Sequence, residues 1–405
     1  MAMRVLTYTS LFPNQLQPAH GVFIYQRMSH FARRDGNEVV VVAPVPYFPS
    51  WLPASKRNVY ANIPKQEQIG NLAVYHPRYP LIPKISMPVH GWFMFLGSYF
   101  TVRRLCRENQ FDAIDAHYVY PDGFAAVLLG KIFNLPMILS ARGTDMNLFP
   151  KFKLIRPMIR WTLQRVRGAI GVCTPLQDAM LESGLAPEKA TVIGNGVDTS
   201  RFYPVDRVEA RKRLSIPQDA QVVVSVGGLI ERKGFHFLIP AVAKIAPRFP
   251  LLKLYIVGAG EWEGKLQSMI KELGMRDRVF LTGPQPNEQL NFWYSAADVS
   301  CLASSREGWP NVLLESMACG TPPVATRVWG TPEVITSPEL GIMVEQSADS
   351  IASGLEIALT RDWNRQKIAQ YARQRTWDVV AAEVEEFFHA KLQTSPQTAT
   401  VRSFA

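Results

Sequence analysis

The sequence predicts an α/β protein made of two doubly wound, Rossmann-like domains. At 405 residues the chain exceeds the size of one ordinary hydrophobic core, so two domains are expected. Hydrophobic residues make up 47% and charged residues 19%, a composition typical of globular rather than disordered chains. Short apolar runs alternate with segments of helical periodicity in both halves of the chain, and this alternation predicts parallel sheets.

In the first half, five apolar runs have the length and composition of buried strands. They lie at 5–8, 39–43, 113–116, 137–140 and 169–173. Segments with helical periodicity lie at 22–34, 92–108, 123–133, 152–167 and 175–183. Residues 44–88 are rich in proline and interrupt the alternation, so we expect an irregular insertion there, with acceptor binding as its candidate role.

The second half repeats the pattern. Strands are expected at 222–226, 252–257, 279–282, 299–302 and 323–325. Helices are expected at 235–248, 261–273, 286–296 and 311–319, followed by a helical run near 363–392. Apolar density falls and charge rises over 198–213, which indicates the junction between the two halves.

These patterns divide the chain into an N-terminal domain at 1–197 and a C-terminal domain at 198–375. Residues 376–392 are expected to return to the first domain as a helix, and 393–405 to form a disordered tail. Two Rossmann-like domains that face each other place a crevice at the carboxyl ends of both sheets, where ligands bind. Gly258-Ala259-Gly260 follows a strand but lacks the third glycine of a dinucleotide fingerprint, so NAD binding is discounted.

The net charge of +10 is concentrated in the first half. Residues 1–200 hold 21 Lys and Arg against 12 Asp and Glu. A basic half suggests an anionic partner, whether a membrane surface or an acidic polymer, and the alternative is a general solubility charge. Basic patches interleaved with aromatic residues and known nucleic-acid-binding motifs are missing from the sequence, so we expect no nucleic acid partner.

Cysteine usage and the N-terminus both indicate a cytoplasmic protein. The start of the chain lacks the apolar core of a signal peptide and has the pattern of a first strand. The cysteines show no CxxC spacing, which gives no sign of a zinc site or a disulfide framework. They are Cys106, Cys173, Cys301 and Cys319.

One apolar segment raises the question of membrane contact. Residues 85–102 are largely apolar and lead into Arg103, Arg104 and Arg107. Pro88 interrupts the segment, which falls short of the roughly 20 continuous apolar residues of a transmembrane helix, so we reject a membrane span. Two alternatives stay open: an interfacial segment with a basic flank, which would place the protein at the inner face of the cytoplasmic membrane, and a buried helix of the first domain.

The most informative stretch of the chain is 307–322, which begins with Glu307. We expect Pro310 in the first turn of a helix, Asn311 as its cap, and Glu315 one turn inside it. The free backbone N–H groups of such a helix start bind anions. An anion site between two carboxylates suits a nucleoside-diphosphate sugar, although two glutamates eight residues apart also occur as solvated surface charges.

The same stretch, Glu-Gly-Trp-Pro-Asn-Val-Leu-Leu-Glu-Ser-Met-Ala-Cys-Gly-Thr-Pro, resembles the E-x7-E signature of the retaining nucleotide-sugar glycosyltransferases of family 4. The resemblance implies the GT-B fold of two facing Rossmann-like domains with an inter-domain cleft. It also implies that Glu315 accepts hydrogen bonds from the ribose and that Glu307 faces the donor sugar. Backbone N–H groups at Asn311, Val312 and Leu313 would then contact phosphate or sugar.

A second matching segment follows the first strand of the second half. Gly227-Gly-Leu-Ile-Glu-Arg-Lys-Gly234 resembles the family's G-R-L-x-x-x-K-G, in which Arg and Lys hold the diphosphate. Lys233 matches the family lysine, whereas Gly228 stands where the family has arginine. Arg232 is a candidate to replace that missing cation, and the alternative is that it is a surface charge.

The first half carries weaker matches to the same family. Gly21 lies in a segment that resembles the glycine-containing loop whose backbone approaches the phosphates. His117 matches the second His of D-x-x-H-x-H, and Asp115 stands in place of the first. Arg142 and Asp145 lie in a segment similar to T-x-H-G-x-D and are candidates for sugar or acceptor binding, although Asp145 is also a candidate helix cap.

These matches together predict a hexosyltransferase that uses a UDP- or GDP-sugar donor and a saccharide or lipid-linked acceptor. The expected role is bacterial surface polysaccharide or exopolysaccharide biosynthesis, with His117, Glu307 and Lys233 as the catalytic residues. The family resemblance implies retention of anomeric configuration without a metal or other cofactor. The alternatives are a nucleotide-sugar epimerase of the same fold and, from another class, a non-enzymatic protein that binds an anionic polymer.

Overall fold

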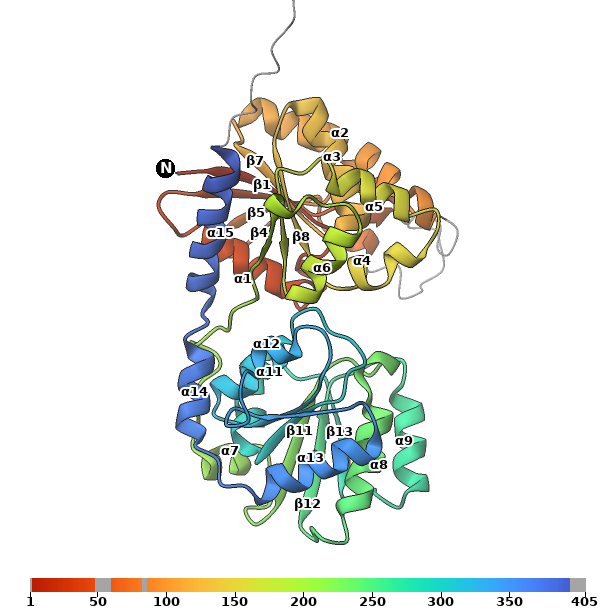
Figure 1. The fold of residues 1–405 in the computed structure, drawn as a ribbon, viewed down its shortest axis with the longest axis vertical. Helices are drawn as coiled ribbons and strands as arrows, with labels where there is room; N and C mark the ends of the chain where they lie inside the picture. The colour runs from red at the N-terminus through yellow and green to blue at the C-terminus, as the bar shows by residue number, and fades with distance from the viewer. Residues whose placement is uncertain (1, 48–59, 82–85, 394–405) are drawn as a thin grey trace, which may run out of the picture. The chain divides into compact units, whose positions relative to one another are not determined.

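The computed structural model describes residues 2–47, 60–81 and 86–393, and the chain divides into two compact units (Figure 1). Unit 1 comprises Met1–Gly194 together with Asp378–Ala405, and unit 2 comprises Asn195–Trp377. The first boundary lies three residues before the predicted one and the second lies two residues after it. The predicted tail at 393–405 falls outside the described residues except for Gln393.

Unit 1 is built on a sheet that has eight strands among the described residues, in the order β10-β9-β8-β7-β1-β2-β5-β4. Neighbouring strands are parallel except for the pair β4 and β5. The strands are β1 (Arg4–Tyr8), β2 (Glu38–Val42), β4 (Gln66–Ile69), β5 (Leu72–Tyr75), β7 (Ala113–His117), β8 (Met137–Ala141), β9 (Gly168–Gly171) and β10 (Ala190–Val192). The central strands β7, β8 and β9 are buried throughout, as expected for a sheet with helices on both faces.

The prediction of an irregular insertion at 44–88 was wrong for most of its described part. Besides β4 and β5, this region forms β3 (Val45–Tyr47) and β6 (Arg78–Pro80), which pair as a small parallel sheet. Strand β4 alternates exposed and half-buried residues because it lies at the edge of the main sheet and pairs only with β5. Proline-rich composition hid these strands because Pro46 and Pro80 occupy a peripheral two-stranded sheet, where proline is tolerated.

Helices and short turns connect the strands of unit 1. The helices are α1 (Val22–Phe31), α2 (His90–Glu108), α3 (Phe124–Phe133), α4 (Thr144–Asn147), α5 (Arg156–Leu163), α6 (Thr174–Glu182) and the C-terminal α15 (Trp377–Leu392). The turns are η2 (Met87–Val89), η3 (Val119–Gly123), η4 (Phe149–Lys151) and η5 (Pro187–Lys189).

Helix α15 packs on α1, although more than 340 residues separate them in the sequence (Figure 1). The rings of Phe31 and Phe388 lie 5.6 Å apart, and both side chains are fully buried. Beside them, the Glu385 carboxylate accepts hydrogen bonds from Arg34 Nε at 2.8 Å and Asn37 Nδ2 at 2.6 Å. Helix α15 therefore packs within unit 1.

The helical run predicted near 363–392 is divided into α14 (Arg365–Arg373) and α15. The break occurs where the backbone pairs with the segment that enters unit 2. Thr376 forms an isolated parallel bridge with Val197, and the Val197 N–H donates to Arg375 O at 2.9 Å. This pairing satisfies backbone hydrogen-bonding groups of both segments. It requires an extended backbone at Thr376, which interrupts the helix.

Unit 2 is a six-stranded parallel sheet in the order β13-β12-β11-β14-β15-β16. The strands are β11 (Gln221–Val226), β12 (Leu252–Val257), β13 (Val279–Gly283), β14 (Val299–Leu302), β15 (Pro323–Thr326) and β16 (Ile342–Val344). The helices are α7 (Arg207–Arg213), α8 (Phe235–Ile245), α9 (Glu263–Glu272), α10 (Leu290–Ala296), α11 (Asn311–Ala318), α12 (Thr331–Val334) and α13 (Ala348–Thr360), besides α14. The turns are η6 (Glu231–Lys233) and η7 (Asn287–Gln289).

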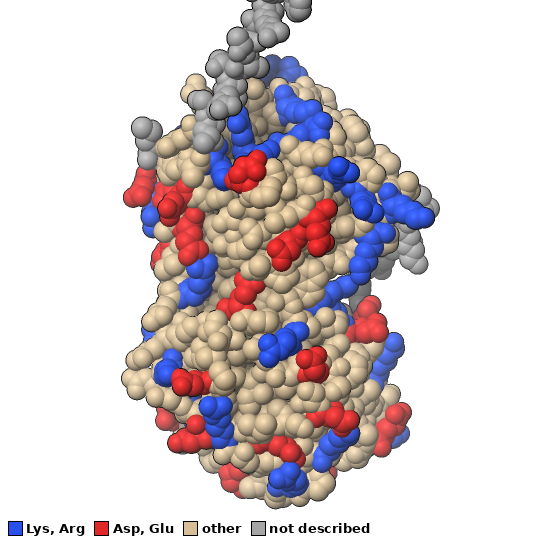
Figure 2. All heavy atoms as spheres, viewed as in Figure 1, with Lys and Arg blue, Asp and Glu red and all other residues tan. Residues whose placement is uncertain are grey.

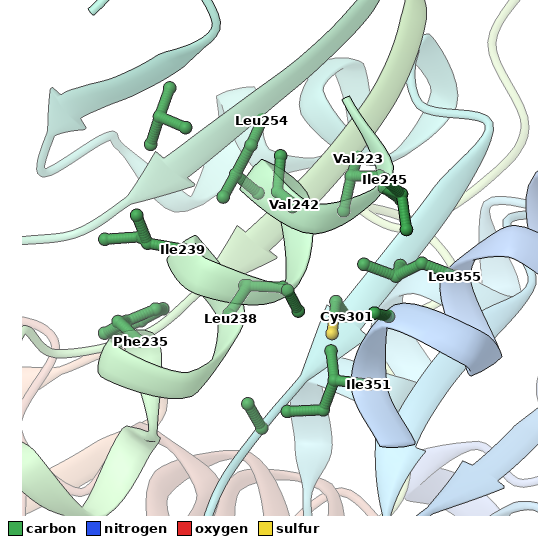
Figure 3. Packing of buried hydrophobic residues seen from close by; sticks show 14 of the residues in the cluster. Val223, Phe235, Leu238, Ile239, Val242, Ile245, Leu254, Cys301, Ile351 and Leu355 are labelled. Atoms are coloured by element: carbon green, nitrogen blue, oxygen red, sulfur yellow. The ribbon is translucent and has the colours of Figure 1, made fainter. Parts of the chain in front are cut away.

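One face of this sheet is covered by α8 and α13. Figure 3 shows Leu238 and Val242 of α8 close to Ile351 and Leu355 of α13, over the strands that carry Val223, Leu254 and Cys301. All of these side chains are buried. Full burial of an aliphatic side chain contributes about 1.5–3 kcal/mol, so this layer holds α8, and the turn before it, firmly in place.

The strand order fixes where each unit offers a site. In unit 2 the order reverses between β11 and β14, and in unit 1 between β1 and β7. Ligands of doubly wound sheets bind outside the carboxyl ends of the strands at such a switch point. The loops that matter are therefore those after β11 and β14 in unit 2, and those after β1 and β7 in unit 1.

Candidate active site

The loop after β11 carries the predicted lysine. It runs through Gly227 and Gly228 to η6, and Gly234 ends η6 in the left-handed conformation with φ +68°. A Cβ at Gly234 would lie 1.9 Å from Ala303 O, on the segment after β14. Only glycine therefore allows the two loops at the switch point to come together, and their contact fixes the position of Lys233.

Lys233 and Glu307 form an ion pair across this switch point. Lys233 Nζ donates to Glu307 Oε1 at 2.6 Å, and Ser304 Oγ donates to the same oxygen at 2.7 Å. Arg232 Nη1 lies 3.3 Å from Glu307 Oε2 and also donates to the backbone oxygen of Arg306 at 2.8 Å. The structure thus brings Arg232, Lys233 and Glu307 together from sequence positions 74 or 75 residues apart.

The two cations of this cluster act on the pKa of Glu307. Burial of Glu307 opposes its charged form, but the neighbouring Lys233 and Arg232 outweigh burial and hold the pKa of the carboxyl below its ordinary value. The Glu307 side chain is 9% exposed, whereas those of Lys233 and Arg232 are 14% and 31% exposed. The carboxylate is therefore enclosed, while both cations retain access to solvent.

Glu315 lies one turn inside α11, as predicted. Tyr294 Oη donates to Glu315 Oε2 at 3.1 Å. Burial raises the pKa of the Glu315 carboxyl to about 7, against the opposing effects of the Tyr294 hydrogen bond and the Lys233 charge. Glu315 therefore titrates near neutral pH, unlike Glu307.

The start of α11 differs from the prediction by one residue. The helix begins at Asn311, and Pro310 occupies the cap position, so Pro310 is not in the first turn and Asn311 is not the cap. The Asn311 side chain instead accepts from Asn195 Nδ2 at 3.0 Å. Proline at the cap forms the turn with its carbonyl group, since Leu313 N–H donates to Pro310 O at 3.0 Å.

The backbone N–H groups expected to bind phosphate or sugar are partly engaged within this turn. Asn311 N–H donates to Trp309 O at 3.1 Å, in addition to the Leu313 bond. The Leu313 side chain is buried in the core, and Val312 packs against it from a half-buried position. Their side chains thus pack, and the role of the three N–H groups stays a prediction.

Gly228 leaves room at the position where the family pattern G-R-L-x-x-x-K-G has arginine. It is exposed, and a Cβ there would meet nothing closer than Ala259 O at 3.9 Å. Its backbone is outside the left-handed region, in contrast to Gly234. The missing arginine is therefore not excluded by the local fold.

In unit 1, His117 is the centre of a buried polar cluster at the end of β7. His117 Nε2 lies 2.8 Å from Asp115 Oδ2, and Arg142 Nη2 and Nε lie 2.5 and 3.2 Å from His117 Nδ1. Since the guanidinium only donates, His117 Nδ1 accepts and Nε2–H donates to Asp115. His117 and Asp115 are 0% and 1% exposed.

Burial and the Arg142 charge lower the pKa of His117 to about 4, although the Asp115 carboxylate acts in the opposite direction. Burial opposes the charged form of Asp115, but His117, Arg27 and Arg142 together outweigh burial and hold the pKa of this carboxyl below its ordinary value. The cluster therefore holds a neutral imidazole between a carboxylate and a guanidinium at neutral pH.

Asp145 binds the surrounding backbone. Its Oδ1 accepts from Gly143 N–H at 2.7 Å and its Oδ2 accepts from Val119 N–H at 2.9 Å, with Arg142 N–H 3.1 Å from Oδ1. The residue lies inside α4 after Gly143, so it does not cap the helix from the cap position. It ties the loop after β8 to the loop after β7 and so supports the Arg142 and His117 backbones.

Gly21 lies in the loop after β1 and precedes α1. Its φ is +64°, and a Cβ would lie 2.2 Å from Leu11 O, so the loop closes on itself at this glycine. Phe23, two residues later, places its ring 5.5 Å from the Arg142 guanidinium. This contact connects the loop of Gly21 with the His117 cluster.

Some residues of both centres were missed by sequence reasoning. Asp122 of η3 is fully buried and accepts a short hydrogen bond from the Ser10 N–H, so it links the two switch-point loops of unit 1. Burial raises the pKa of Asp122 to about 7, against this hydrogen bond. Ser304 and Tyr294 complete the surroundings of the two glutamates in unit 2. The only sequence signal for Asp122 is a charged residue in the otherwise uncharged stretch 116–130.

The described residues hold no cluster of three or more His, Cys, Asp or Glu side chains that is suited to a metal ion. Within the same residues, no helix combines the length and apolar character needed to cross a membrane.

The two halves of the chain match models of sugar-transferring enzymes. Residues 206–375 match "Glycosyl transferases group 1", and residues 21–201 match "Glycosyltransferase Family 4". The chain is 26% identical to the putative teichuronic acid biosynthesis glycosyltransferase TuaC of Bacillus subtilis, over 99% of the chain and all of that protein. It is 31% identical to the D-inositol 3-phosphate glycosyltransferase of Acidothermus cellulolyticus, over 73% of the chain and 71% of that protein.

Solved structures share the fold at low sequence identity. Sucrose-phosphate synthase from Thermosynechococcus elongatus superposes with a TM-score of 0.78 and 20% identity, covering 98% of this chain and all of that one. HepE of Anabaena, solved in complex with UDP, gives a TM-score of 0.71 and 18% identity, covering 96% of this chain and all of that one. The protein is thus a glycosyltransferase enzyme with the GT-B fold. It belongs to glycosyltransferase family 4.

Proposed function

We propose that the protein transfers a hexose-type sugar from a UDP- or GDP-sugar to a saccharide or lipid-linked acceptor, with retention of anomeric configuration. The observation that carries this proposal is the Lys233–Glu307 pair at the switch point of unit 2, where two partly exposed cations surround one enclosed carboxylate. The relative named for teichuronic acid biosynthesis supports a role in bacterial surface polysaccharide biosynthesis, and the structural neighbour solved with UDP supports a nucleotide-sugar donor.

Four of the predicted donor-binding residues have charged side chains with a role in this proposal. Lys233 and Arg232 bind the diphosphate, because a cation about 4 Å from a phosphate gains on the order of 4 kcal/mol at an effective dielectric near 20. Glu315 accepts hydrogen bonds from the ribose, and Glu307 faces the donor sugar. None of these roles needs a metal or other cofactor. We therefore expect sugar transfer to persist in the presence of a chelator.

The proposed reaction exchanges one bond at the anomeric carbon. The acceptor hydroxyl forms a bond to C1 as the bond from C1 to the phosphate oxygen breaks, and the hydroxyl proton passes to the departing phosphate. Lys233 stabilises the negative charge that develops on this phosphate. His117, Arg142 and Asp145 are themselves buried, so in this proposal they hold in place the loops of unit 1 that bind the sugar or acceptor.

We also propose that unit 1 contacts the inner face of the cytoplasmic membrane. Four side chains of η2 and α2 share one helical face and are exposed: Val89, Trp92, Leu96 and Phe100. Arg103, Arg104 and Arg107 follow them on α2 and are exposed too. Figure 2 shows Lys and Arg side chains gathered at the end of unit 1 that carries α2. An apolar face with a basic flank binds anionic bilayer surfaces.

The test of the enzymatic proposal is nucleotide binding by calorimetry with UDP, GDP and ADP and their sugar conjugates. Binding selective for one nucleotide is expected to weaken about 10- to 150-fold in Lys233→Ala and in Glu315→Ala, since hydrogen bonds to charged groups contribute roughly 1.5–3 kcal/mol. Lys271→Ala removes an exposed lysine of unit 2 and is the matched control. Unchanged affinity in both site variants would exclude this site as the donor site.

Product analysis with the selected donor separates transfer from epimerisation. An epimerase would interconvert the donor sugar without an acceptor, whereas a transferase releases the nucleoside diphosphate only as the acceptor becomes glycosylated.

A further inference from the structure

A groove of about 410 Å³ lies on unit 1 beside α2, and none of the predicted site residues lines it. Tyr75 of β5 and Arg78 of β6 line one side, and Phe100 and Arg104 of α2 line the other. Gly97 lets α2 approach β6 closely, because a Cβ there would lie 2.4 Å from Arg78 O. This close approach holds the two sides of the groove, which we call the α2 groove, in fixed register.

The α2 groove is positively charged. Lys65, Arg78 and Arg104 line it, and no carboxylate is among the described residues that do. The nearby Glu67 is not among the lining residues, and its carboxylate is engaged elsewhere: Oε1 lies 2.7 Å from His76 Nε2, while His76 Nδ1 lies 3.0 Å from Ala43 O.

Arg78 lines this groove, and one of its donors has no partner among the described residues. Its Nη2 donates a short hydrogen bond to Ile63 O, but its Nη1 is buried and has no hydrogen-bond partner among the described residues. A buried donor left without an acceptor is costly, so such groups mark positions where a ligand or water completes the structure. A phosphate oxygen is the acceptor that a guanidinium binds best.

Arg104 is also available to an anion. Its guanidinium lies 5.4 Å from the centre of the Tyr75 ring, which orients it along the groove. Its carboxylate neighbour Glu108 is 3.9 Å away, and both side chains are 56% exposed. An exposed pair at that distance contributes little and yields readily to a stronger anion.

The groove continues into an apolar surface. Phe100, which lines the groove, is 73% exposed, and Leu96 and Trp92 are 59% and 45% exposed. With Val89 these residues form the α2 stripe, an apolar row along one face of the helix. A soluble phosphate would use the cations and leave the stripe without a partner. A lipid phosphate uses both, with its headgroup in the groove and its acyl region against the stripe.

We propose that the α2 groove binds the phosphate of a membrane lipid through Arg78 and Arg104, while the α2 stripe enters the boundary of the acyl chains. This inference deepens the proposed membrane contact and rests on it, whereas sugar transfer does not depend on it. The site would add direct binding of the lipid phosphate to the general attraction between unit 1 and negative charge.

The test is sedimentation of the full-length protein with phosphatidylcholine vesicles, with and without phosphatidic acid. The double variant Arg78→Gln/Arg104→Gln is expected to bind the phosphatidic acid vesicles about 30-fold more weakly, since each cation near the surface is worth about 1 kcal/mol. The control variant Lys271→Gln/Arg276→Gln removes two exposed cations of unit 2 and so changes the net charge by the same amount. It is expected to bind the vesicles as the wild type does. Arg104→Gln alone, at an exposed position, is expected to lose about fivefold without affecting the fold.

Equal losses in both double variants would overturn the proposal, because they would show that only net charge matters. Titration with inorganic phosphate identifies the source of the ligand: tight binding of free phosphate together with no preference for phosphatidic acid vesicles would overturn the lipid assignment. Nucleotide binding by the same preparations separates this inference from the enzymatic one. Intact nucleotide binding without groove-dependent vesicle binding rejects only the lipid site, and loss of nucleotide binding by the wild type rejects the proposed donor site.

Discussion

The switch points of the two units carry polar clusters of different kinds. In unit 1, His117, Asp115 and Asp145 are 0–1% exposed, and every bond described for them is to another part of unit 1. In unit 2, Lys233 and Arg232 bind the enclosed Glu307, and their side chains are 14% and 31% exposed. The same topology thus supports a closed scaffold in one unit and an accessible charged centre in the other.

The difference teaches which residues are free to exchange partners. The buried cluster of unit 1 keeps one geometry because each broken bond would leave a further unpaired buried group, in addition to Asp115 Oδ1, which has no hydrogen-bond partner among the described residues. A partly exposed cation exchanges a carboxylate for a phosphate at much smaller cost. We therefore expect ligands to act mainly on the bonds of unit 2, while unit 1 keeps its cluster unchanged.

Arg142→Met is the strongest way to break this comparison. The substitution removes the buried donor to His117 Nδ1 and one of the two cations, Arg27 and Arg142, that favour the charged form of Asp115, and breaking a buried charged network costs about 3–5 kcal/mol. Denaturant unfolding measures the loss. Arg232→Met in unit 2 is the matched control and is expected to cost less than about 1 kcal/mol. Similar losses in both variants would contradict the contrast between a closed and an accessible centre.

The pH dependence of stability sharpens the comparison within unit 1. Burial raises the pKa of Asp122 to about 7, whereas an unfolded Asp titrates near 4. Between these values the folded state holds a proton that the unfolded state has released, so stability falls as pH rises from about 4 to 7, by up to about 1.4 kcal/mol per pH unit. Asp122→Asn is expected to flatten this slope.

Glu315 contributes a slope of the same sign in unit 2, since its pKa is also about 7. Unfolding measured from pH 5 to 8 in Asp122→Asn, Glu315→Gln and the double variant therefore separates the two units. An unchanged slope in Asp122→Asn would show that this carboxyl is ionised throughout the range.

Two glycines of the same loop in unit 2 provide a smaller, local test. Gly234→Ala places a Cβ 1.9 Å from Ala303 O in a left-handed backbone, and we expect a loss of about 1–3 kcal/mol in unfolding free energy. Gly228→Ala has open space and an ordinary backbone, so a change within about 0.5 kcal/mol is expected. If the two variants were equally stable, the tight contact of the switch-point loops would be refuted.

Glu307→Gln tests whether the accessible centre exchanges partners. The carboxylate competes with a ligand anion for Lys233, so its neutral isostere is expected to bind nucleoside diphosphate more tightly, by about tenfold or 1.4 kcal/mol, while sugar transfer decreases. Calorimetry and a transfer assay on the same variant measure the two effects. Weaker diphosphate binding would mean that Glu307 holds Lys233 in position without competing for it.

The sequence predicted the elements that depend on local pattern. The buried strands of both sheets and most helices were found because apolar runs and helical periodicity mark them directly. Strands β4 and β5 were missed because they lie at the sheet edge within proline-rich sequence, and β16 because it has only three residues. The one-residue error at Pro310 reflects the limit of cap signals, which do not separate the cap from the first turn.

The sequence named candidate site residues, but it did not reveal their contacts. The family resemblance selected Lys233 and Glu307 separately, yet their ion pair depends on β11 and β14 being neighbours, which only the strand order reveals. Asp122 and Tyr294 were missed because their importance arises from burial beside groups distant in sequence. The roles of Gly21, Arg142 and Asp145 in binding stay predictions.

The position of α15 has a consequence for how the chain reaches its folded state during synthesis. Unit 1 lacks Phe388 and Glu385, the partners of Phe31, Arg34 and Asn37, until nearly the whole chain has left the ribosome. Unit 2 is complete earlier, at Trp377. The half that is translated first is therefore the half that is finished last, and a truncated fragment that ends near Gly194 would expose an apolar face of α1 and aggregate unless residues 378–392 were supplied with it.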